Sequence, residues 1–591
     1  MRTHVVEMSV FVFFFLLVTI LGFLAARWRR GDLDLLDEWG LGGRAFGTLI
    51  TWFLIGGDLY TAYTIIAVPA LVFGAGAMGF FAVAYCILIY PLGFVVLPRL
   101  WAVSRKHGYV TAADFVRGRY GSHWLAMAVA LTGILATMPY IALQLVGMNV
   151  VLEQMGLKGD WPLLIAFLIL ALYTYSSGLR APALIALVKD AMIYIMVIAV
   201  VVYIPYKLGG YGHIFTVAGN LLSAKRPPGA LILPQASFSA YATLAFGSAL
   251  ALFMYPHSVT AILAAKDGET IRRNQVLLPA YSVLLSLIAL MGLMALAAGL
   301  NPATPNLAVP LLMEWALPPW FAGFCYAAVA IGALVPAAIM SIASANLFTR
   351  NLYREYWRKD ATPKQESQVA KLVSLVVKLG ALAFILLLPQ QYAIDLQLLG
   401  GAWILQTLPA IVFGLWRRHF HHSALLAGWA SGMAASTAME ISLNMKGSIY
   451  PLHLFGHTYP AYAACYALAL NLGITAALSL CLDAFRVARH ADATMDSDYE
   501  DRDPRWGMAK STVESCAMPH LPGKVSRWPY ILLLIPFVAL LLPGTYARME
   551  PMLLGFPFFY WYQILWVALG AMLTGTVFWL QRGTAKGCGP Q

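Results

Sequence analysis

Long apolar stretches separated by short polar loops dominate the chain. A helix needs about 20 consecutive apolar residues to cross a bilayer. We interpret fifteen stretches as candidate spans, near residues 5–26, 46–73, 77–102, 123–153, 161–179, 183–206, 238–265, 274–300, 319–350, 366–388, 394–416, 422–444, 459–482, 529–543 and 555–580. The pattern predicts an all-α polytopic membrane protein with about 13 core helices and a final pair.

Composition and charge support this interpretation. Only 11% of the 591 residues are charged, against about 25% in soluble domains, which excludes a soluble enzyme and a disordered protein. With the N-terminus outside, the inner loops hold 28 of the 39 lysines and arginines and the outer segments hold 7. Cytoplasmic loops carry such an excess. We therefore expect a multi-pass protein of the inner (cytoplasmic) membrane, with its C-terminus inside, and no nucleic-acid partner.

One long polar stretch divides the chain. Residues 483–527 are rich in charged and small residues and read as a solvated cytoplasmic linker. The linker separates a transport-type bundle, residues 1–482, from an appended two-helix membrane module, residues 528–591. We expect the module to contact the bundle or another membrane protein.

Two candidate spans carry helix-breaking residues. The second span contains Gly56, Gly57 and Asp58 near its midpoint, and the seventh contains Tyr255, Pro256 and His257 near its inner end. Interrupted helices at matching positions of two halves are typical of inverted-repeat transporters, whose binding site lies near the bilayer midplane. The alternative is that these residues serve only packing or kinks.

Ionisable residues inside spans are candidates for function because they are costly there unless paired or hydrated. Asp58 lies beside the two glycines, where an unwound helix would free carbonyl groups for a cation. Lys189 and Asp190 are adjacent in the sixth span, so at least one is expected to point into the bundle. The alternatives are a structural acid at Asp58 and an interfacial lysine with its counter-ion at 189–190.

Other polar residues inside the spans are further candidates for function. The ninth span places Ser341, Ser344 and Asn346 close together, a strip that serves either helix packing or cation binding. Tyr140 and Gln144, one turn apart, can hydrogen-bond a substrate or each other. No ATP-binding loop, catalytic constellation or metal-ligand spacing occurs in the sequence. We expect neither enzyme activity nor a cofactor, apart from a coupling ion, Na⁺ or H⁺.

Three segments resemble the sodium:solute symporter family over residues 5–482. They are Leu41 to Arg44, Gly178 to Asp190, and Ala338 to Ser341 continuing into Thr349 to Tyr353. Residues 56–60, 188–190 and 255–257 are most similar to its bacterial monocarboxylate permease branch. The resemblance implies the leucine-transporter 5+5 inverted-repeat fold and uptake of pyruvate, lactate, acetate or propionate, sometimes alanine. Residues 528–582 resemble a small two-helix membrane protein family of unknown function that accompanies such permeases.

The resemblance also implies a cation site, and this chain departs from it twice. The family's sodium ligands fall on the carbonyls of Gly56, Leu59 and Ala338 and on the hydroxyl of Ser341. Ile342 occupies the position of a second hydroxyl, and Lys189 replaces the hydroxyl residue that usually precedes the acid at Asp190. Our hypothesis is that the Lys189 ammonium takes part of the place of sodium and couples uptake to protons. The alternative keeps sodium, with water or Asp58 as the missing ligand.

For the substrate, we expect the carboxylate to meet the half-helix after the first break, within a small aromatic pocket. The residues assigned to it are Tyr60, Thr61, Tyr63, Tyr140, Gln144, Tyr255 and His257. The predicted function is secondary active symport of short monocarboxylates by alternating access. The alternatives are an importer of alanine or histidine with the same fold, and a sensor that binds solute without net transport.

Overall fold

The computed structural model describes residues 2–27, 31–157, 159, 161–225, 227–387, 392–416, 420–500 and 528–586. In its first half the helices are α1 Arg2–Leu24, α2 Leu36–Leu41, α3 Thr48–Leu59, α4 Val68–Ala75, α5 Phe81–His107, α6 Ala112–Tyr120, α7 His123–Gln154, α8 Trp161–Ser177, α9 Arg180–Lys207, α10 Tyr211–Ala224, α11 Phe238–Leu252 and α12 Pro256–Leu263. In its second half they are α13 Gly268–Leu277, α14 Pro279–Ala289, α15 Met291–Ala297, α16 Ala308–Ala316, α17 Pro319–Phe348, α18 Pro363–Leu387, α19 Ile394–Ile404, α20 Leu408–Val412, α21 His422–Ser442, α22 Ala463–Ala484, α23 Ile535–Leu540 and α24 Phe558–Lys586.

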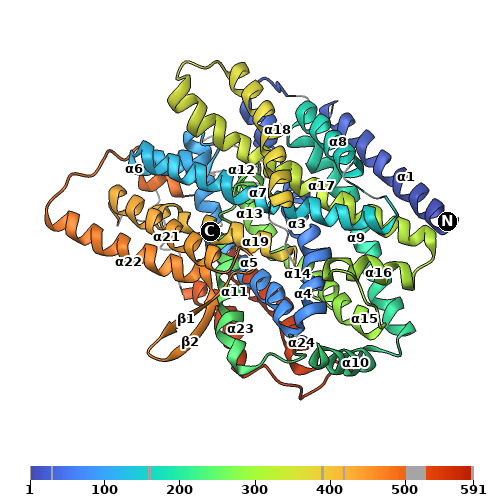
Figure 1. The fold of residues 1–591 in the computed structure, drawn as a ribbon. Coiled ribbons are helices and arrows are strands. Elements are labelled where there is room, and N and C mark those ends of the chain that lie inside the picture. Colours follow the sequence, from blue (N-terminus) through green and yellow to red (C-terminus); the bar gives the residue numbers. More distant parts are fainter. Residues whose placement is uncertain are drawn as a thin grey trace.

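The helices form one bundle arranged around α17 (Figure 1). Helices α1, α7, α9 and α18 pack against α17, whose apolar span is buried along its whole length. Within the described residues, ten helices are long and apolar enough to span a membrane, or eleven if α11 and α12 count as one bent span. The candidates near 46–73, 161–179 and 529–543 contain only shorter apolar helices, and the one near 422–444 forms α21, which does not pass the same test of length and composition. The prediction of a helical, multi-pass membrane protein is confirmed.

Both predicted interruptions are present. Helix α3 ends at Leu59, because Tyr60 has a non-helical ψ of 85°, and a π-helical turn, η3 (Tyr63–Ala67), leads into α4. Helices α11 and α12 meet at an angle of 47°, where Pro256 lacks the N–H that would continue the helix. The first break lies slightly later than Gly56–Asp58, since both glycines stay within α3.

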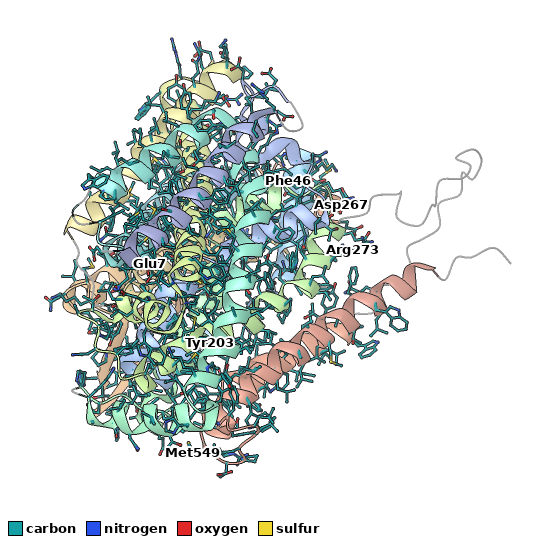
Figure 2. All side chains as sticks on the ribbon, turned by 90° about the vertical axis from the view of Figure 1, so that its right-hand side faces the viewer. Glu7, Phe46, Tyr203, Asp267, Arg273 and Met549 are labelled. Atoms are coloured by element: carbon teal, nitrogen blue, oxygen red, sulfur yellow. The ribbon has the colours of Figure 1, made fainter. Side chains whose placement is uncertain are left out.

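The bundle has two distinct ends, which we name after the short helices they carry. At the α6 end, Phe46 pairs with the chain after α12, accepting from Lys266 N–H (3.0 Å) and donating to Ala264 O (3.1 Å). The α10 end carries α10 and the chain around Met549; Figures 1 and 2 show the two ends at opposite poles of the molecule. Our predicted topology would place the α6 end in the cytoplasm.

A β-hairpin departs from the expected all-α structure. Strands β1 (Ile449–Leu454) and β2 (His457–Tyr462) pair antiparallel between α21 and α22. The turn residues Phe455 and Gly456 both have positive φ, which is the backbone of the tight turns that match the twist of hairpin strands. The apolar run near 459–482 hid this hairpin, because its first residues belong to β2 and not to a helix.

Part of the predicted linker is packed against the bundle. The docked segment, residues 486–500, lies along α6 at the α6 end, where Ala493 N–H donates to Gly118 O (2.9 Å) and Arg119 pairs with Asp492 (2.8 Å). Residues 501–527 lie outside the described residues. The domain boundaries at 482 and 528 stay predictions.

Candidate functional site

Lys189 brings a charge to the first helix break. Its ammonium donates to the carbonyl of Gly57 (2.8 Å) and to the carbonyl of Tyr60 (3.0 Å). It also lies 3.2 Å from Oδ1 of Asp190, and both side chains are fully buried. The two residues therefore both point into the bundle, and the interfacial-lysine interpretation is wrong. The cation occupies carbonyl groups that α3 leaves free where it ends.

Asp190 is held from the opposite side by Tyr281 of α14. The Tyr281 hydroxyl donates to Asp190 Oδ2 (2.6 Å), and Tyr60 donates to the backbone carbonyl of Tyr281 (3.2 Å). The rings of Tyr60 and Tyr281 are 4.5 Å apart. Tyr281 was not predicted from the sequence, since one tyrosine in an apolar span carries no pattern; its proximity to Asp190 depends on the packing of α14 against α9.

Two glycines of α3 make this arrangement sterically feasible. A Cβ on Gly57 would lie 3.0 Å from the Lys189 nitrogen, and a Cβ on Gly56 would lie 2.2 Å from Cζ of Tyr281. Both contacts are closer than side-chain carbons normally tolerate. The glycine pair therefore serves close approach of α9 and α14 to the break, a role that the sequence analysis did not assign to it.

The remaining expected cation ligands lie on α17 and in α3. Ser341 is buried and its hydroxyl donates to the carbonyl of Ala338 (2.8 Å), so these two oxygens are neighbours. The carbonyls that Lys189 binds belong to Gly57 and Tyr60, each one residue beyond the expected Gly56 and Leu59. The side chains of Asp58 and Leu59 lie outside the described residues, and their roles stay predictions.

Three aromatic rings meet at the second break. Tyr140 of α7 lies 5.2 Å from Tyr255 and 5.4 Å from His257, measured between ring centroids, and Tyr255 lies 5.3 Å from His257. The Tyr255 hydroxyl donates to Gln397 O (3.0 Å). Both ring nitrogens of His257 are buried without a hydrogen-bond partner among the described residues. Such a group is costly to bury and is suited to a ligand.

Gln144 joins this aromatic group to the first break. Its side-chain oxygen accepts from the Ala62 N–H (3.0 Å), and the Thr61 hydroxyl accepts from the Tyr63 N–H (3.0 Å). Gln144 and Thr61 thus satisfy backbone groups that the interrupted helix leaves unpaired. The Tyr60 hydroxyl donates instead to the backbone carbonyl of Tyr281, whose own hydroxyl binds Asp190.

A small cavity lies between the second break and the α6 end. It is lined by Met254 and Pro256 at the break, by Thr260 of α12, by Gly133 of α7 and by Thr111 just before α6, among others. Asn351 closes the cavity at the α6 end, because its side chain contacts the Thr111 hydroxyl (2.8 Å) and Asp114 (2.7 Å). The cavity connects the neighbourhood of His257 with the α6 end.

Comparisons with known proteins agree with this architecture. A family model described as the sodium:solute symporter family matches residues 39–432, and a model described as a protein of unknown function (DUF3311) matches residues 531–588. A monocarboxylate transport permease protein of Rhizobium johnstonii is 56% identical over 81% of this chain and 97% of its own length. An uncharacterized symporter of Bacillus subtilis, YodF, is 34% identical over 73% of this chain and 87% of its own length.

A solved structure gives the fold independently. A Na⁺-coupled sialic acid symporter matches with a TM-score of 0.66 over 82% of this chain and 99% of that chain, at 15% sequence identity. This likeness confirms the predicted leucine-transporter-type fold. Together with the family match and the 56% identical relative, it shows that this chain belongs to the sodium:solute symporter family.

Proposed function

We propose that this symporter imports short-chain monocarboxylates across a bacterial inner membrane by alternating access, driven by the proton gradient. The name of the 56% identical relative supports the substrate class. The observation that carries the proposal is the Lys189 ammonium, which donates to two carbonyls of the first broken helix. While Lys189 is protonated, its ammonium group takes the place on these carbonyl oxygens that a bound cation would otherwise have.

Protonation of Lys189 controls the state of the break in this proposal. The ammonium holds Gly57 on α3, Tyr60 just after α3, and Asp190 on α9. Loss of its proton removes the charge that makes both hydrogen bonds strong, and the carbonyls then need another partner. Proton release to one side of the membrane is therefore coupled to rearrangement of α3, as symport requires. The alternative keeps sodium at the oxygens of Ala338 and Ser341, with water or Asp58 as the missing ligand.

The substrate site lies between the two breaks. The carboxylate meets the helix start at η3, whose N-terminal end is positive, and His257 supplies the buried polar group that needs a partner. The rings of Tyr140 and Tyr255 lie against His257, so the walls leave room only for a short carbon tail.

Uptake into proteoliposomes tests the proposal. Labelled pyruvate, lactate, acetate and propionate are offered under an imposed pH gradient without sodium, and under a sodium gradient at equal pH. We expect accumulation in the first condition and little in the second. Sodium-dependent uptake alone would assign the alternative coupling ion.

The same preparation separates the competing functions. Strong competition by alanine or histidine, with no effect of propionate, would indicate an amino-acid importer. Saturable binding without accumulation under either gradient would indicate a sensor.

A further inference from the structure

The appended module is packed along the side of the bundle. Figure 2 shows α24 at the periphery, rising obliquely from the α10 end near Met549. Its main partners in the bundle are α5, α13 and α14. At its other end Val577 forms a small apolar cluster with Phe94 of α5 and Leu533 of the module. The contact therefore follows most of the length of α24.

The docked face of α24 has the spacing of a packed helix. Buried residues recur every three or four positions, while Leu565, Met572 and Trp579 on the other face are exposed. The buried positions are Phe559, Tyr560, Gln563, Val567, Gly570, Thr574 and Val577. Small residues at such positions allow close helix approach in membranes. A Cβ on Gly570 would lie 3.2 Å from Ile87, and one on Gly575 would lie 3.4 Å from Val276.

Two polar contacts attach the module to the start of α11, the first half of the second broken span. The Tyr241 hydroxyl of α11 donates to Gln563 Oε1 (2.6 Å), and both side chains are fully buried. The Tyr560 hydroxyl donates to the carbonyl of Leu231 (2.8 Å), in the segment that precedes α11. Without the module, the Tyr241 hydroxyl would lose this buried hydrogen bond, at a cost in stability.

The length of the Rhizobium relative shows that the bundle also occurs without a fused module. The 481 matched residues make up 97% of that relative. It is therefore too short to hold a transport domain of this size and the module as well. The module also matches a family model of its own, so it behaves as a separate unit of sequence.

We propose that residues 528–586 are a subunit held by these contacts and not by the linker. The subunit clamps α11, the first half of the second broken span, to α5, α13 and α14. It moves with these helices as one unit during transport. Its partner surface is the face of α5 and α13 around Ile87, Phe94 and Val276, together with Tyr241.

Cleavage of the linker tests how the module is held. A protease site is placed between residues 505 and 520 of the full chain, and the purified protein is cut in lipid nanodiscs. We expect the C-terminal fragment to co-elute with the bundle. Dissociation of the fragment would overturn the proposal. This result does not depend on the solute carried, so it stands apart from the proposed function.

A pair of matched variants tests the docked face. Gly570→Leu places a large side chain against Ile87, whereas Met572→Leu changes a residue that is 67% exposed. We expect Gly570→Leu to lower the equilibrium constant for retention of the cut fragment about tenfold, and Met572→Leu to leave it unchanged. Equal retention in both variants would contradict the assigned surface.

A cross-link tests whether the module moves with the bundle helices. Ile87→Cys and Gly570→Cys are combined in a full chain whose native cysteines are replaced, and a disulfide is formed by oxidation. We expect pyruvate uptake in proteoliposomes to stay within about twofold of the reduced protein and of the oxidised single-cysteine variants. A tenfold loss that a reductant reverses would show that the module must shift, and would overturn the clamp.

Discussion

A lysine that donates to two backbone carbonyls of a broken helix is an unusual use of a charge in a membrane. The cost of burying an ammonium is offset only when its N–H groups have acceptors and its charge has a counter-ion. Lys189 meets this requirement with Gly57, Tyr60 and Asp190. Removal of the ammonium should therefore affect the shape of the break as well as its charge.

Lys189→Gln should abolish uptake driven by a pH gradient, with a loss of at least about tenfold, because an amide cannot carry the coupled proton. The measurement is initial uptake of labelled pyruvate in proteoliposomes. Lys266→Gln is the control, since that side chain is 54% exposed. Unimpaired proton-driven uptake in Lys189→Gln would remove the role assigned to the lysine.

Gly56→Ala should lower the free energy of unfolding by about 1–3 kcal/mol. The added Cβ meets the ring of Tyr281, which cannot turn away without breaking its bond to Asp190. Thermal melting of the purified protein measures the change. Gly47→Ala is the matched control at the start of the same helix, since nothing lies within 4 Å of its Cβ position. Equal melting of the two variants would contradict the packing described for Gly56.

The sequence was sufficient to identify Lys189, Asp190 and the polar residues near the second break as candidates, because ionisable and helix-breaking residues are rare in apolar spans. It was insufficient for Tyr281 and for the close contacts of Gly56. Such contacts depend on which helices become neighbours, and a single sequence contains no direct record of that. The hydrogen bond from the Tyr60 hydroxyl to the carbonyl of Tyr281 has the same cause.

At the scale of elements, the docked segment shows how a polar stretch becomes ordered. Asp498 accepts from Lys106 and His107 at the end of α5 and from the Met495 N–H. Burial alone would raise the pKa of Asp498, but these hydrogen bonds outweigh it and hold the pKa well below its usual value. The carboxylate is therefore ionised whenever the segment is docked near neutral pH.

Asp498→Asn should release the docked segment, measured as faster hydrogen exchange of residues 488–500 after correction for intrinsic rates. Because the pKa is lower when docked than when free, wild-type docking should persist at neutral pH. It should weaken only as the pH falls below about 4, the ordinary value for a free aspartate. Asp496→Asn changes an exposed neighbour and serves as the control. Unchanged exchange in Asp498→Asn would show that other contacts hold the segment.

The helix pattern predicted the spans and both interruptions well, because apolar runs and proline or glycine act locally. The docked segment and the β-hairpin were not predicted. Charged and small residues indicate solvation unless a specific set of partners exists, here Lys106, His107 and Arg119, and those partners lie more than 370 positions away in the chain.

At the scale of the whole molecule, the cavity near the second break lies towards one end of the bundle. It extends from Met254 towards Thr111 at the α6 end, the end that our topology places in the cytoplasm.

Lys266→Cys, in a background without native cysteines, replaces a side chain that is 54% exposed at the α6 end and should react with a membrane-impermeant thiol reagent added to the cytoplasmic side only. Thr304→Cys, exposed between α15 and α16, should react from the opposite side. Labelling of inside-out and right-side-out vesicles measures both. Reversed labelling of the pair would invert the predicted topology.

The covalent connection between bundle and module has a consequence for stoichiometry. A cell that makes the two parts as separate polypeptides can produce them in unequal amounts, and an unassembled two-helix protein would expose its docked face to lipid. Translation as a single polypeptide delivers one copy of each part to the same place in the bilayer. The cell can then no longer regulate the transporter by varying the supply of the smaller part. In return, every bundle is made together with its module.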